Sequence, residues 1–394
     1  MVDIYTAFEG GGVKGIGLVG GLAQLQASAP DVRIRGFAGT SAGAIVAALA
    51  AVGYPVSSAS PDDEGGATLE TILMELNLLE LLDGLEEFPL TKLKDLMSAI
   101  WDESAAGEPD FVDQLIELLQ DLQSVKQRWL LGRKLFSWLS FGHKYSKKGR
   151  ASAISLRDVL DLVRRLKADK GIYGTRRFRK WLAGHLEARA SVTDKDGRVT
   201  FGSLKEQRNI ELHIVAADVG RSRERLFNEQ SSPDMEIADA VLASMSLPLF
   251  FQPVHYFHTY VVDGGIVSNF PAWPFESSNR TNQQTIPIVG FRLVPEQPEM
   301  RVGRIESFGD YARAVAATVL DGPGFLQTEF LQYYLPIEIK VPQEIGTMDF
   351  DLTPEQKKKL LENGRAAVVD ALVDQPARQL LQIPEIDLKL EDRP

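Results

Sequence analysis

The chain has 394 residues, of which 44% are hydrophobic and 25% charged, and this balance excludes a disordered, collagenous or disulfide-rich protein. Asp and Glu outnumber Lys and Arg by 54 to 43, a formal charge of −11, so we expect no nucleic acid partner. The sequence contains no cysteine, which excludes disulfides, thiolate catalysis and zinc sites built from cysteine.

Strand and helix patterns alternate over the first fifty residues. In chain order we expect a strand at Val2–Phe8, a glycine loop at Gly10–Gly15, a helix at Ile16–Ala27, a strand at Arg33–Ala38 and a helix at Ala42–Val52. Short connections between such elements indicate an α/β fold with a mainly parallel central sheet and helices on its faces.

Elements of the same kind return after residue 205. Apolar runs predict strands at Ile210–Ala217, Tyr260–Val262 and Ile286–Leu293. A last helix begins with a capping box, in which Thr353 is the N-cap, Pro354 the first helical residue and Gln356 the third. We expect its apolar residues to face the core: Leu360, Leu361, Ala367 and Val368.

The stretch between these two parts is helical in pattern and segregated in charge. Residues 62–120 hold 16 acidic and 2 basic residues, whereas residues 122–157 hold nine basic residues, no acidic ones and five aromatics. We expect one domain over residues 1–394, with a large, mainly helical insertion at 55–205. A C-terminal extension at 300–394, built of helix and strand, should pack on the core.

The pentapeptide Gly39-Thr40-Ser41-Ala42-Gly43 lies between a predicted strand and a predicted helix. Small residues on both sides permit the sharp turn that lifts a serine hydroxyl clear of the backbone. The following helix begins beside Ser41, and its dipole favours a developing negative charge. The motif predicts a nucleophilic serine, although glycines in such a motif can also be purely structural.

The hexapeptide GGGVKG at Gly10–Gly15 follows the first strand directly. Consecutive glycines let backbone N–H groups approach a ligand oxygen, as an oxyanion hole or a phosphate cradle requires. Gly10, Gly12 and Gly15 have the dinucleotide-binding spacing, but the second strand lacks the acidic residue that would bind a ribose. Gly15 is followed by Ile16, which departs from a P-loop. Because the serine motif comes one strand later, we favour the oxyanion hole.

Asp263-Gly264-Gly265 ends a predicted strand and can present a carboxylate to a cleft. The five histidines are His143, His185, His213, His255 and His258. None follows Asp263, so the order serine, acid, histidine of an α/β-hydrolase cannot be built with it. His255 and His258 could act as bases, but a loop or strand-edge role fits them better. The simplest mechanism is a Ser41–Asp263 dyad in which the carboxylate takes the serine proton.

The order GGGVKG, GTSAG and a distant DGG resembles the bacterial branch of the patatin-like phospholipase family. Two further segments are similar to that family: residues 243–253 (ASMSLPLFFQP) before the acid, and Asn269-Phe270-Pro271 after it. The resemblance covers roughly residues 1–54 and 205–295, with a similar helix near 354–374, and the insertion matches poorly. It implies a three-layer α/β/α fold, acyl-ester hydrolysis and no catalytic metal or other cofactor.

Carried over by position, the resemblance makes Ser41 the nucleophile and Asp263 the base. It places the oxyanion hole at Gly10, Gly11, Gly12 and Val13, with supporting motif residues Lys14, Gly15, Gly39, Gly43, Gly264 and Gly265. Two positions depart mildly from the family pattern, since Lys14 stands where the family often has Arg and Glu9 where it often has Asp.

The basic segment 122–157 is a candidate membrane-facing element. Its basic and aromatic residues are suited to anionic headgroups and to the bilayer interface. The candidates are Lys126, Arg128, Trp129, Arg133, Lys134, Trp138, Lys144, Lys147 and Lys148. The alternative is a cap in which this segment pairs with the acidic one before it. The two interpretations combine in one hypothesis, in which an acidic hairpin shields a basic lid until an activating partner or small ligand opens it.

The sequence therefore predicts a serine acyl-ester hydrolase of the phospholipase A or lysophospholipase type, acting on membrane phospholipids. A neutral-lipid or small-ester hydrolase with the same dyad is the alternative, and a non-catalytic phosphate- or nucleotide-binding module is a remote one. The N-terminus has no basic region before its first strand pattern, so we expect a soluble, cytoplasmic protein that associates peripherally with membranes. Secretion by a route without a signal peptide remains open.

Overall fold

The structure, a computed structural model, describes residues 1–57, 66–93, 156–190, 193–296, 331, 333–347 and 349–382. The chain divides into two compact units. The first comprises residues 1–83, 169–302 and 317–394, and the second comprises residues 84–168 and 303–316. The first unit holds every strand of the described part of the chain.

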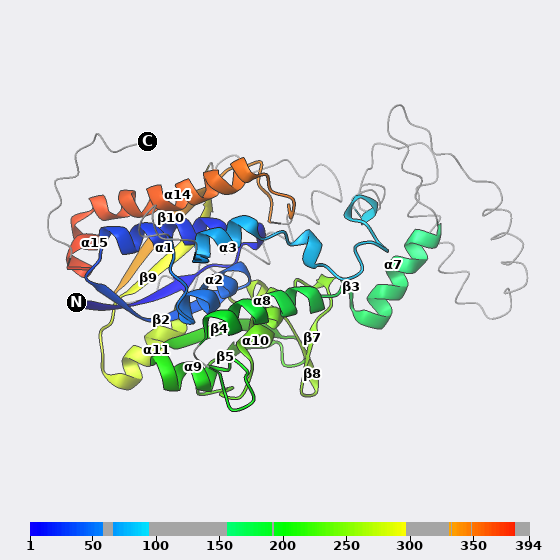
Figure 1. Cartoon of the computed structure of the whole chain (residues 1–394), viewed down its shortest axis with the longest axis horizontal. Coiled ribbons are helices and arrows are strands. Elements are labelled where there is room, and N and C mark those ends of the chain that lie inside the picture. Colours follow the sequence, from blue (N-terminus) through cyan, green and yellow to red (C-terminus); the bar gives the residue numbers. More distant parts are fainter. Residues whose placement is uncertain are drawn as a thin grey trace, which may run out of the picture. The chain divides into compact units, whose positions relative to one another are not determined.

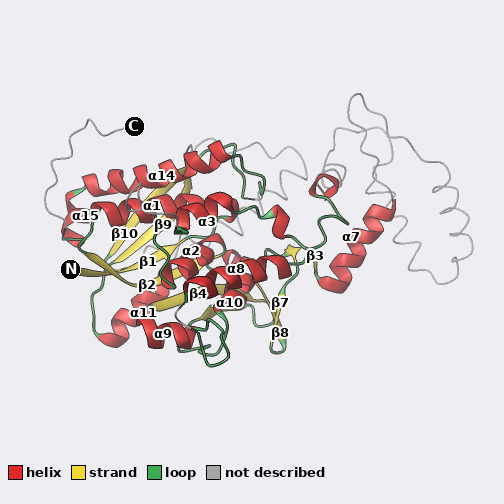
Figure 2. Ribbon diagram, viewed as in Figure 1, coloured by secondary structure: helices red, strands yellow, loops and turns green. Residues whose placement is uncertain are grey.

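An eight-stranded sheet forms the centre of the first unit (Figures 1 and 2). Its order is β10 (Tyr334–Val341), β9 (Ile288–Pro295), β1 (Val2–Phe8), β2 (Val32–Thr40), β4 (Glu211–Asp218), β8 (Thr259–Asp263) and β7 (Val254–Tyr256), with β5 (Arg223–Phe227) also paired to β4. The run from β10 to β4 is parallel, whereas β5, β7 and β8 pair antiparallel. A separate parallel pair joins β3 (Gly171–Tyr173) to β6 (Leu249–Phe251).

Helices cover both faces of the sheet. On one face α1 (Ile16–Ser28) lies along α14 (Pro354–Val373), as Figure 1 shows. A Cβ on Gly20 would overlap the carbonyl oxygen of Leu361, so the glycines of α1 permit this close approach. On the other face lies α11 (Trp273–Asn282), whose Phe275 ring stacks on Tyr5 of β1 at 4.2 Å between centroids.

The remaining helices connect the strands or flank the sheet. The α-helices are α2 (Ala42–Ala51), α3 (Leu69–Glu75), α7 (Leu156–Asp169), α8 (Arg176–Arg189), α9 (Phe201–Arg208), α10 (Ile237–Met245) and α15 (Gln375–Leu380). Single 3₁₀ turns occur at η1 (Gly12–Gly15), η2 (Leu79–Leu81) and η4 (Gly264–Ile266). Of these, α2, η1 and η4 directly follow the strands β2, β1 and β8 and bear on the site described below.

The alternation of side chains along the parallel strands divides the core into two layers. Phe8 stacks on Phe291 of β9 at 5.2 Å on the face of α1, where the Phe291 ring also lies against Gly21. Tyr5 and Ile288 belong to a buried cluster with Phe275 on the opposite face. Because one strand supplies both layers, a shift of β1 by one residue would exchange them, and burial therefore defines its register.

Most of the elements expected from the sequence are confirmed. The first two strands, α1, α2, β4 and β8 agree within a residue or two, and β9 lies two residues further along than expected. The capping box of α14 forms as expected, with Leu360, Ala367 and Val368 buried, whereas Leu361 is only partly buried.

Four short strands (β3, β5, β6 and β7) were not expected, and β10 lies in the C-terminal extension, for which helix and strand were expected without bounds. The signal for β10 was present, because Leu335, Ile337, Ile339 and Val341 alternate with exposed residues. Its edge position explains this half-buried pattern. The short strands have too few residues for any period to show.

The second unit is described only at residues 84–93 and 156–168. Here Lys92 pairs with Asp158, and Arg165 donates to Glu87 at 2.7 Å while its guanidinium lies over the Phe88 ring. The nine residues that we expected to face a membrane, from Lys126 to Lys148, lie outside the described residues. The membrane-facing and lid hypotheses therefore stay predictions. Where the structure describes the chain, none of its helices combines the length and apolarity needed to cross a bilayer.

Candidate active site

Ser41 occupies a strained turn between β2 and α2. Its φ of 52° and ψ of −121° are rare for a residue with a side chain. A Cβ on Gly39 would overlap the carbonyl oxygen of Gly43, and a Cβ on Gly43 would overlap that of Phe8. The glycines of the motif therefore allow β2, α2 and β1 to converge, and the turn exposes the Ser41 hydroxyl at the end of the sheet.

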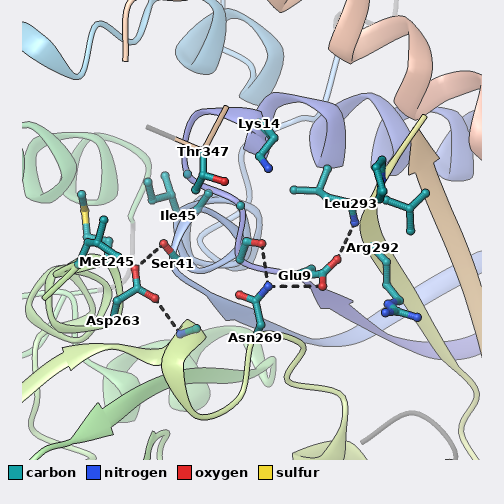
Figure 3. Close-up of a pocket in the computed structure, with 18 of the residues that line it drawn as sticks. Glu9, Lys14, Ser41, Ile45, Met245, Asp263, Asn269, Arg292, Leu293 and Thr347 are labelled. Carbon is teal, nitrogen blue, oxygen red and sulfur yellow. Dashed lines mark hydrogen bonds between the residues drawn. The ribbon is translucent and has the colours of Figure 1, made fainter. Parts of the chain in front are cut away.

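The Ser41 hydroxyl and the Asp263 carboxylate are in direct contact (Figure 3). Ser41 Oγ donates to Asp263 Oδ2 at 2.8 Å, across 222 positions of sequence. Asp263 is the last residue of β8, and its other oxygen, Oδ1, accepts from the Gly265 N–H at 2.7 Å. A Cβ on Gly264 would overlap the carbonyl oxygen of Val215, so the two glycines after Asp263 allow η4 to turn tightly against β4.

The Asp263 side chain is deeply buried, with 5% of the residue exposed. Burial raises its pKa to about 6, against the opposing effect of the hydrogen bonds from Gly265 and Ser41. Near neutral pH the carboxylate is therefore ionised but more basic than an exposed aspartate. This places it in the range suited to a general base.

A second serine, Ser244, is hydrogen-bonded to the backbone of the turn. The Ser41 N–H donates to Ser244 Oγ at 2.9 Å, and Ser244 Oγ donates in turn to the Val215 carbonyl at 2.6 Å. Ser244 is wholly buried on α10. The segment containing Ser244 was singled out in the sequence, but the role of this hydroxyl was missed, since only the fold brings it under Ser41.

The glycine loop lies against Ser41. A Cβ on Gly10 would come within 3.3 Å of Ser41 Cβ, and Gly12 has a φ of 57°, which favours glycine. The Gly10 N–H donates to the Asn269 carbonyl at 2.9 Å and is therefore not free for an oxyanion. In the described part of the chain, the N–H groups of Gly11 and Gly12 have no acceptor. Gly11 is the N-cap of η1 and Gly12 is its first residue, and N–H groups at the start of a helix have no acceptor within that helix.

The other residues expected to form or support this loop serve different purposes. Val13 lies away from the cavity at Ser41 and lines a small neighbouring one instead. Lys14 is nearly buried and lines the main cavity, where Figure 3 shows it above the loop. Gly15 packs against Ala42, so that η1 and α2 approach closely.

Glu9 and Asn269 brace the loop from the side of β9 (Figure 3). The buried Glu9 carboxylate accepts from the Leu293 N–H at 2.6 Å and from Asn269 Nδ2 at 3.4 Å. Asn269 Nδ2 also lies 3.3 Å from the Gly10 carbonyl oxygen. Glu9 therefore joins the end of β1 to β9 at the base of the loop.

A cavity of about 580 Å³ opens over Ser41 and Asp263. One part is apolar and is lined by Ile45, Leu78, Met245, Leu247, Phe251 and Phe350. Another part is charged and is lined by Lys14, Arg292, Glu296, Glu338 and Lys340. Figure 3 shows Ile45 and Met245 beside Ser41, and Arg292 beyond Glu9. A smaller cavity of about 50 Å³ shares Ile45, Leu78 and Phe350 with the apolar part.

No described histidine lines this cavity. His255 and His258 are exposed in and after β7, at the strand edge as expected, and His213 is buried in β4 beside Asn228. Within the described ranges, no three His, Asp or Glu side chains converge closely enough to hold a metal ion. The site offers a hydroxyl, a buried carboxylate, loop N–H groups and an apolar cavity, which together suit ester cleavage by a serine.

Comparison with known proteins agrees with this geometry. The family model described as patatin-like phospholipase matches residues 6–65 and 88–276, more than half of the chain. The uncharacterized protein YqhO of Bacillus subtilis is 25% identical over 376 residues, covering 92% of this chain and 95% of that protein. The probable lipid hydrolase 463L of Invertebrate iridescent virus 6 is 30% identical over 87 residues, covering 22% of this chain and 30% of that protein.

Among solved structures, VipD from Legionella pneumophila matches with 18% identity and a TM-score of 0.45. The match covers 94% of this chain and 66% of the VipD chain, so this chain spans a little under two thirds of that protein. The family model, whose span includes both Ser41 and Asp263, establishes the relationship without it. The chain therefore belongs to the patatin-like phospholipase family of lipid-hydrolysing esterases.

Proposed function

We propose that this chain hydrolyses the acyl esters of phospholipids, with Ser41 as nucleophile and Asp263 as general base. The observation that carries the proposal is the 2.8 Å hydrogen bond from Ser41 Oγ to Asp263 Oδ2 at the floor of a largely apolar cavity. In the first step Ser41 Oγ attacks the ester carbonyl and its proton passes to Asp263.

The tetrahedral intermediate then collapses, and the departing alkoxide takes the proton from Asp263, which leaves an acyl ester on Ser41. Asp263 next removes a proton from water, which attacks the acyl carbon and releases the fatty acid and the serine hydroxyl. One carboxylate serves both steps because it is the only titratable group that the structure places against Ser41 Oγ in the described residues.

We assign the oxyanion hole to the N–H groups of Gly11 and Gly12, and not to that of Gly10, which donates to Asn269. The start of α2 at Ser41 adds its dipole to these donors. Removal of one such donor typically lowers the turnover by about 10²- to 10³-fold. The brace formed by Glu9 and Asn269 keeps the loop in the shape that this role requires.

The two parts of the cavity suggest how a phospholipid would lie. The apolar part beside Ser41 suits an acyl chain, and the smaller cavity, which shares Ile45 with it, could take the chain's distal end if the side chain of Ile45 moves. The charged part contains Lys14, Arg292 and Lys340, whose cations suit a phosphodiester. Because cations in the cavity lining attract an anionic headgroup more strongly than an uncharged lipid, we rank neutral lipids below phospholipids as substrates.

The predictions made from the sequence for the insertion and for membrane association are kept as proposals. We propose that the protein associates peripherally with membranes when it acts. The basic segment 122–157 is the predicted lid or contact, and an activating partner or ligand is its predicted switch. We also retain the prediction of a single catalytic domain that includes the insertion at 55–205 and the extension at 300–394.

Covalent labelling and product release test the proposal. A fluorophosphonate should label wild-type protein at Ser41, as read by peptide mass spectrometry, and should fail to label Ser41→Ala. Fatty-acid release should be measured from phospholipid vesicles, triacylglycerol emulsions and a soluble short-chain ester, for wild type, Ser41→Ala and Asp263→Asn. Both substitutions nearly preserve volume, and a thermal melt confirms that each variant folds.

We expect release by the wild type alone, with phospholipid preferred over triacylglycerol. Hydrolysis by folded Ser41→Ala would refute the assigned nucleophile. Equal or better hydrolysis of triacylglycerol would refute the assigned substrate while leaving the dyad intact. Wild-type protein that neither reacts with the fluorophosphonate nor cleaves any of the three esters would refute the activity.

A further inference from the structure

Four large apolar side chains are exposed on and around the β7–β8 hairpin. Val219, Leu249, Phe257 and Tyr260 are each 37% to 70% exposed. They come from the turn between β4 and β5, from β6, and from the β7–β8 hairpin, which projects from the edge of the sheet in Figure 1. An exposed cluster of this kind marks an interaction surface more often than scattered single residues do.

Contacts link Val219, Lys170 and Tyr260 on one face of the β7–β8 hairpin, while the Phe257 ring at its tip lies edge-on to Tyr256 on the other face. The Val219 N–H donates to the Tyr260 carbonyl at 3.0 Å, and Lys170 Nζ lies 4.8 Å from the centre of the Tyr260 ring. Gly171, the residue after Lys170, pairs with Leu249 across the β3–β6 ladder. Phe257 forms the tip of the hairpin that contains Tyr260. We call these residues together the hairpin patch: Lys170, Val219, Leu249, Phe257 and Tyr260.

The backbone of the patch is as unusual as its exposure. Phe257 has a φ of 52°, Leu249 of 68° and Lys170 of 61°, in the left-handed region that glycine and asparagine favour. In the two-residue turn Phe257–His258 only the first residue has positive φ, and a turn of this kind favours Gly at that position. Phe257 is therefore unfavourable both in its conformation and in its contact with water. Neither the positive φ of Phe257 nor the exposure of its ring to water stabilises the protein on its own.

The patch continues into the apolar part of the cavity over Ser41. Leu249 is the exposed first residue of β6, while Leu247 before it and Phe251 after it line that cavity. The same short segment thus offers one apolar side chain to the outside and two to the place where we expect an acyl chain. A partner surface that contacts the hairpin patch would therefore lie next to the apolar part of the cavity over Ser41.

We propose that the hairpin patch docks on the polar–apolar interface of a phospholipid bilayer. Phe257 and Leu249 would enter the acyl region, while the Tyr260 ring and the Lys170 ammonium beside it would lie at the level of the headgroups. An aromatic ring with a cation beside it and apolar side chains around it is the arrangement that suits the headgroup level of a bilayer, and the continuity of the patch with the apolar part of the cavity favours a lipid surface as its occupant. The inference rests on the proposed function, since it supplies the route by which a bilayer lipid reaches Ser41.

The test uses asparagine variants of the full chain, because asparagine is among the residues that best tolerate the positive φ of Phe257 and Leu249. Phe257→Asn and Leu249→Asn remove apolar surface without opposing the local fold. Tyr333→Asn is the matched control, since Tyr333 is also an exposed aromatic residue with positive φ (51% exposed, φ 54°). It precedes β10, at the opposite edge of the sheet from β7. Phe257→Trp keeps an interfacial aromatic ring at the tip.

Binding is measured by sedimentation with vesicles of mixed zwitterionic and anionic phospholipids, and catalysis by hydrolysis of a soluble short-chain ester. We expect Phe257→Asn and Leu249→Asn each to weaken vesicle partitioning by about fivefold to tenfold. Tyr333→Asn and Phe257→Trp should partition like the wild type. All four should cleave the soluble ester at the wild-type rate.

Unchanged vesicle partitioning of both Phe257→Asn and Leu249→Asn would overturn the proposal and leave a protein partner as the reason for the patch. A loss of the same size in Tyr333→Asn would overturn it as well, because the effect would then not belong to the patch. Failure of wild-type protein to cleave the soluble ester would count against the proposed function alone, since partitioning is measured without turnover.

Discussion

Ser41 and Ser244 are joined by a hydrogen bond from the Ser41 N–H to Ser244 Oγ at 2.9 Å, although 203 positions of sequence separate them. Ser244 Oγ donates its own proton to the Val215 carbonyl at 2.6 Å and so links the strained turn to the central strand β4. The bond satisfies the Ser41 N–H at the point where the backbone leaves common conformations. We therefore expect Ser244 to act as a positioning residue for Ser41, the proposed nucleophile.

Removal of that hydroxyl should impair catalysis more than stability. In Ser244→Ala, we expect the free energy of unfolding to fall by about 1–2 kcal/mol, for lost buried hydrogen bonds. We expect kcat on a soluble ester to fall by about 10- to 100-fold, because the turn no longer holds Ser41 Oγ in place. Ser246→Ala is the control, since Ser246 Oγ is also buried but donates to Leu242 on its own helix. An equal loss of kcat in both variants would contradict a specific role for Ser244.

Asp263→Asn should abolish catalysis and stabilise the fold. Because the folded pKa of Asp263 is raised to about 6, the folded protein holds this proton more tightly than the unfolded chain does. Stability therefore decreases as pH rises from about 4 to about 6, and at neutral pH the ionised carboxylate costs at most about 3 kcal/mol. Asparagine carries no charge and can still accept from Gly265. A higher Tm than wild type at pH 7.5, with the difference absent near pH 4, is the expected result.

The pH dependence of activity follows from the same group. Only ionised Asp263 can take the Ser41 proton, so kcat/KM on a soluble ester should be level above pH 7 and fall about tenfold per unit well below pH 6. The midpoint should lie near 6 and not near the usual value of an aspartate. A pH profile measured over the range in which the melting curve is unchanged provides the test. A midpoint near 4 would mean that the carboxylate is solvated in the working enzyme.

Gly43 has no room for a Cβ whereas Gly184 has open space, and alanine at these two positions tests the packing of the turn at Ser41. A Cβ on Gly43 would overlap the Phe8 carbonyl, so Gly43→Ala should destabilise the protein by roughly 3 kcal/mol or more. Gly184 lies within α8 with open space around its Cα, so Gly184→Ala should stabilise the protein by roughly 0.5–1 kcal/mol. Chemical denaturation of the two variants gives both signs in one experiment. A neutral Gly43→Ala would contradict the close approach of β1 to α2.

Ile45 should control the length of the acyl chain that the enzyme accepts. It lies one turn after Ser41 on α2 and lines both the main and the smaller cavity. In Ile45→Trp the indole should occupy the space beside this residue in both cavities, raising KM for a long-chain ester by about tenfold while leaving a butyryl ester unaffected. Kinetics on a series of soluble esters of increasing chain length provide the measurement. A uniform rise in KM across the series would place the acyl chain elsewhere.

The early elements could be read from the sequence because their signals are local. The Gly39–Gly43 turn needs small residues at fixed offsets, and the capping box of α14 lies within four residues. The buried strands around them are continuous apolar runs. The β7–β8 hairpin was only half visible, since its tip holds Phe257 where a turn signal would be Asn or Gly.

The candidate site likewise has features that could be predicted from local sequence and features that could not. Ser41 and Asp263 could be named in advance because each stands in a short motif after a predicted strand. That the two side chains meet could not be read, because β8 runs antiparallel to β4 and brings Asp263 back beside the end of β2. Which glycine N–H stays free could not be read, because Asn269, far along the chain, decides that Gly10 is occupied. Nor could the brace from Glu9 to Leu293, which depends on β1 and β9 being neighbours.

By itself, the sequence determined the chemistry of this protein: an α/β fold, a serine on a strained turn, a carboxylate without a following histidine, and a loop of glycines. Those properties depend on residue type and on spacing over a few positions. The tertiary structure alone decided which groups meet, namely Ser244 under Ser41, two free loop N–H groups, and a cavity with an apolar and a charged part. Hydrogen bonding and burial act between residues that packing brings together, and along this chain those residues lie more than two hundred positions apart.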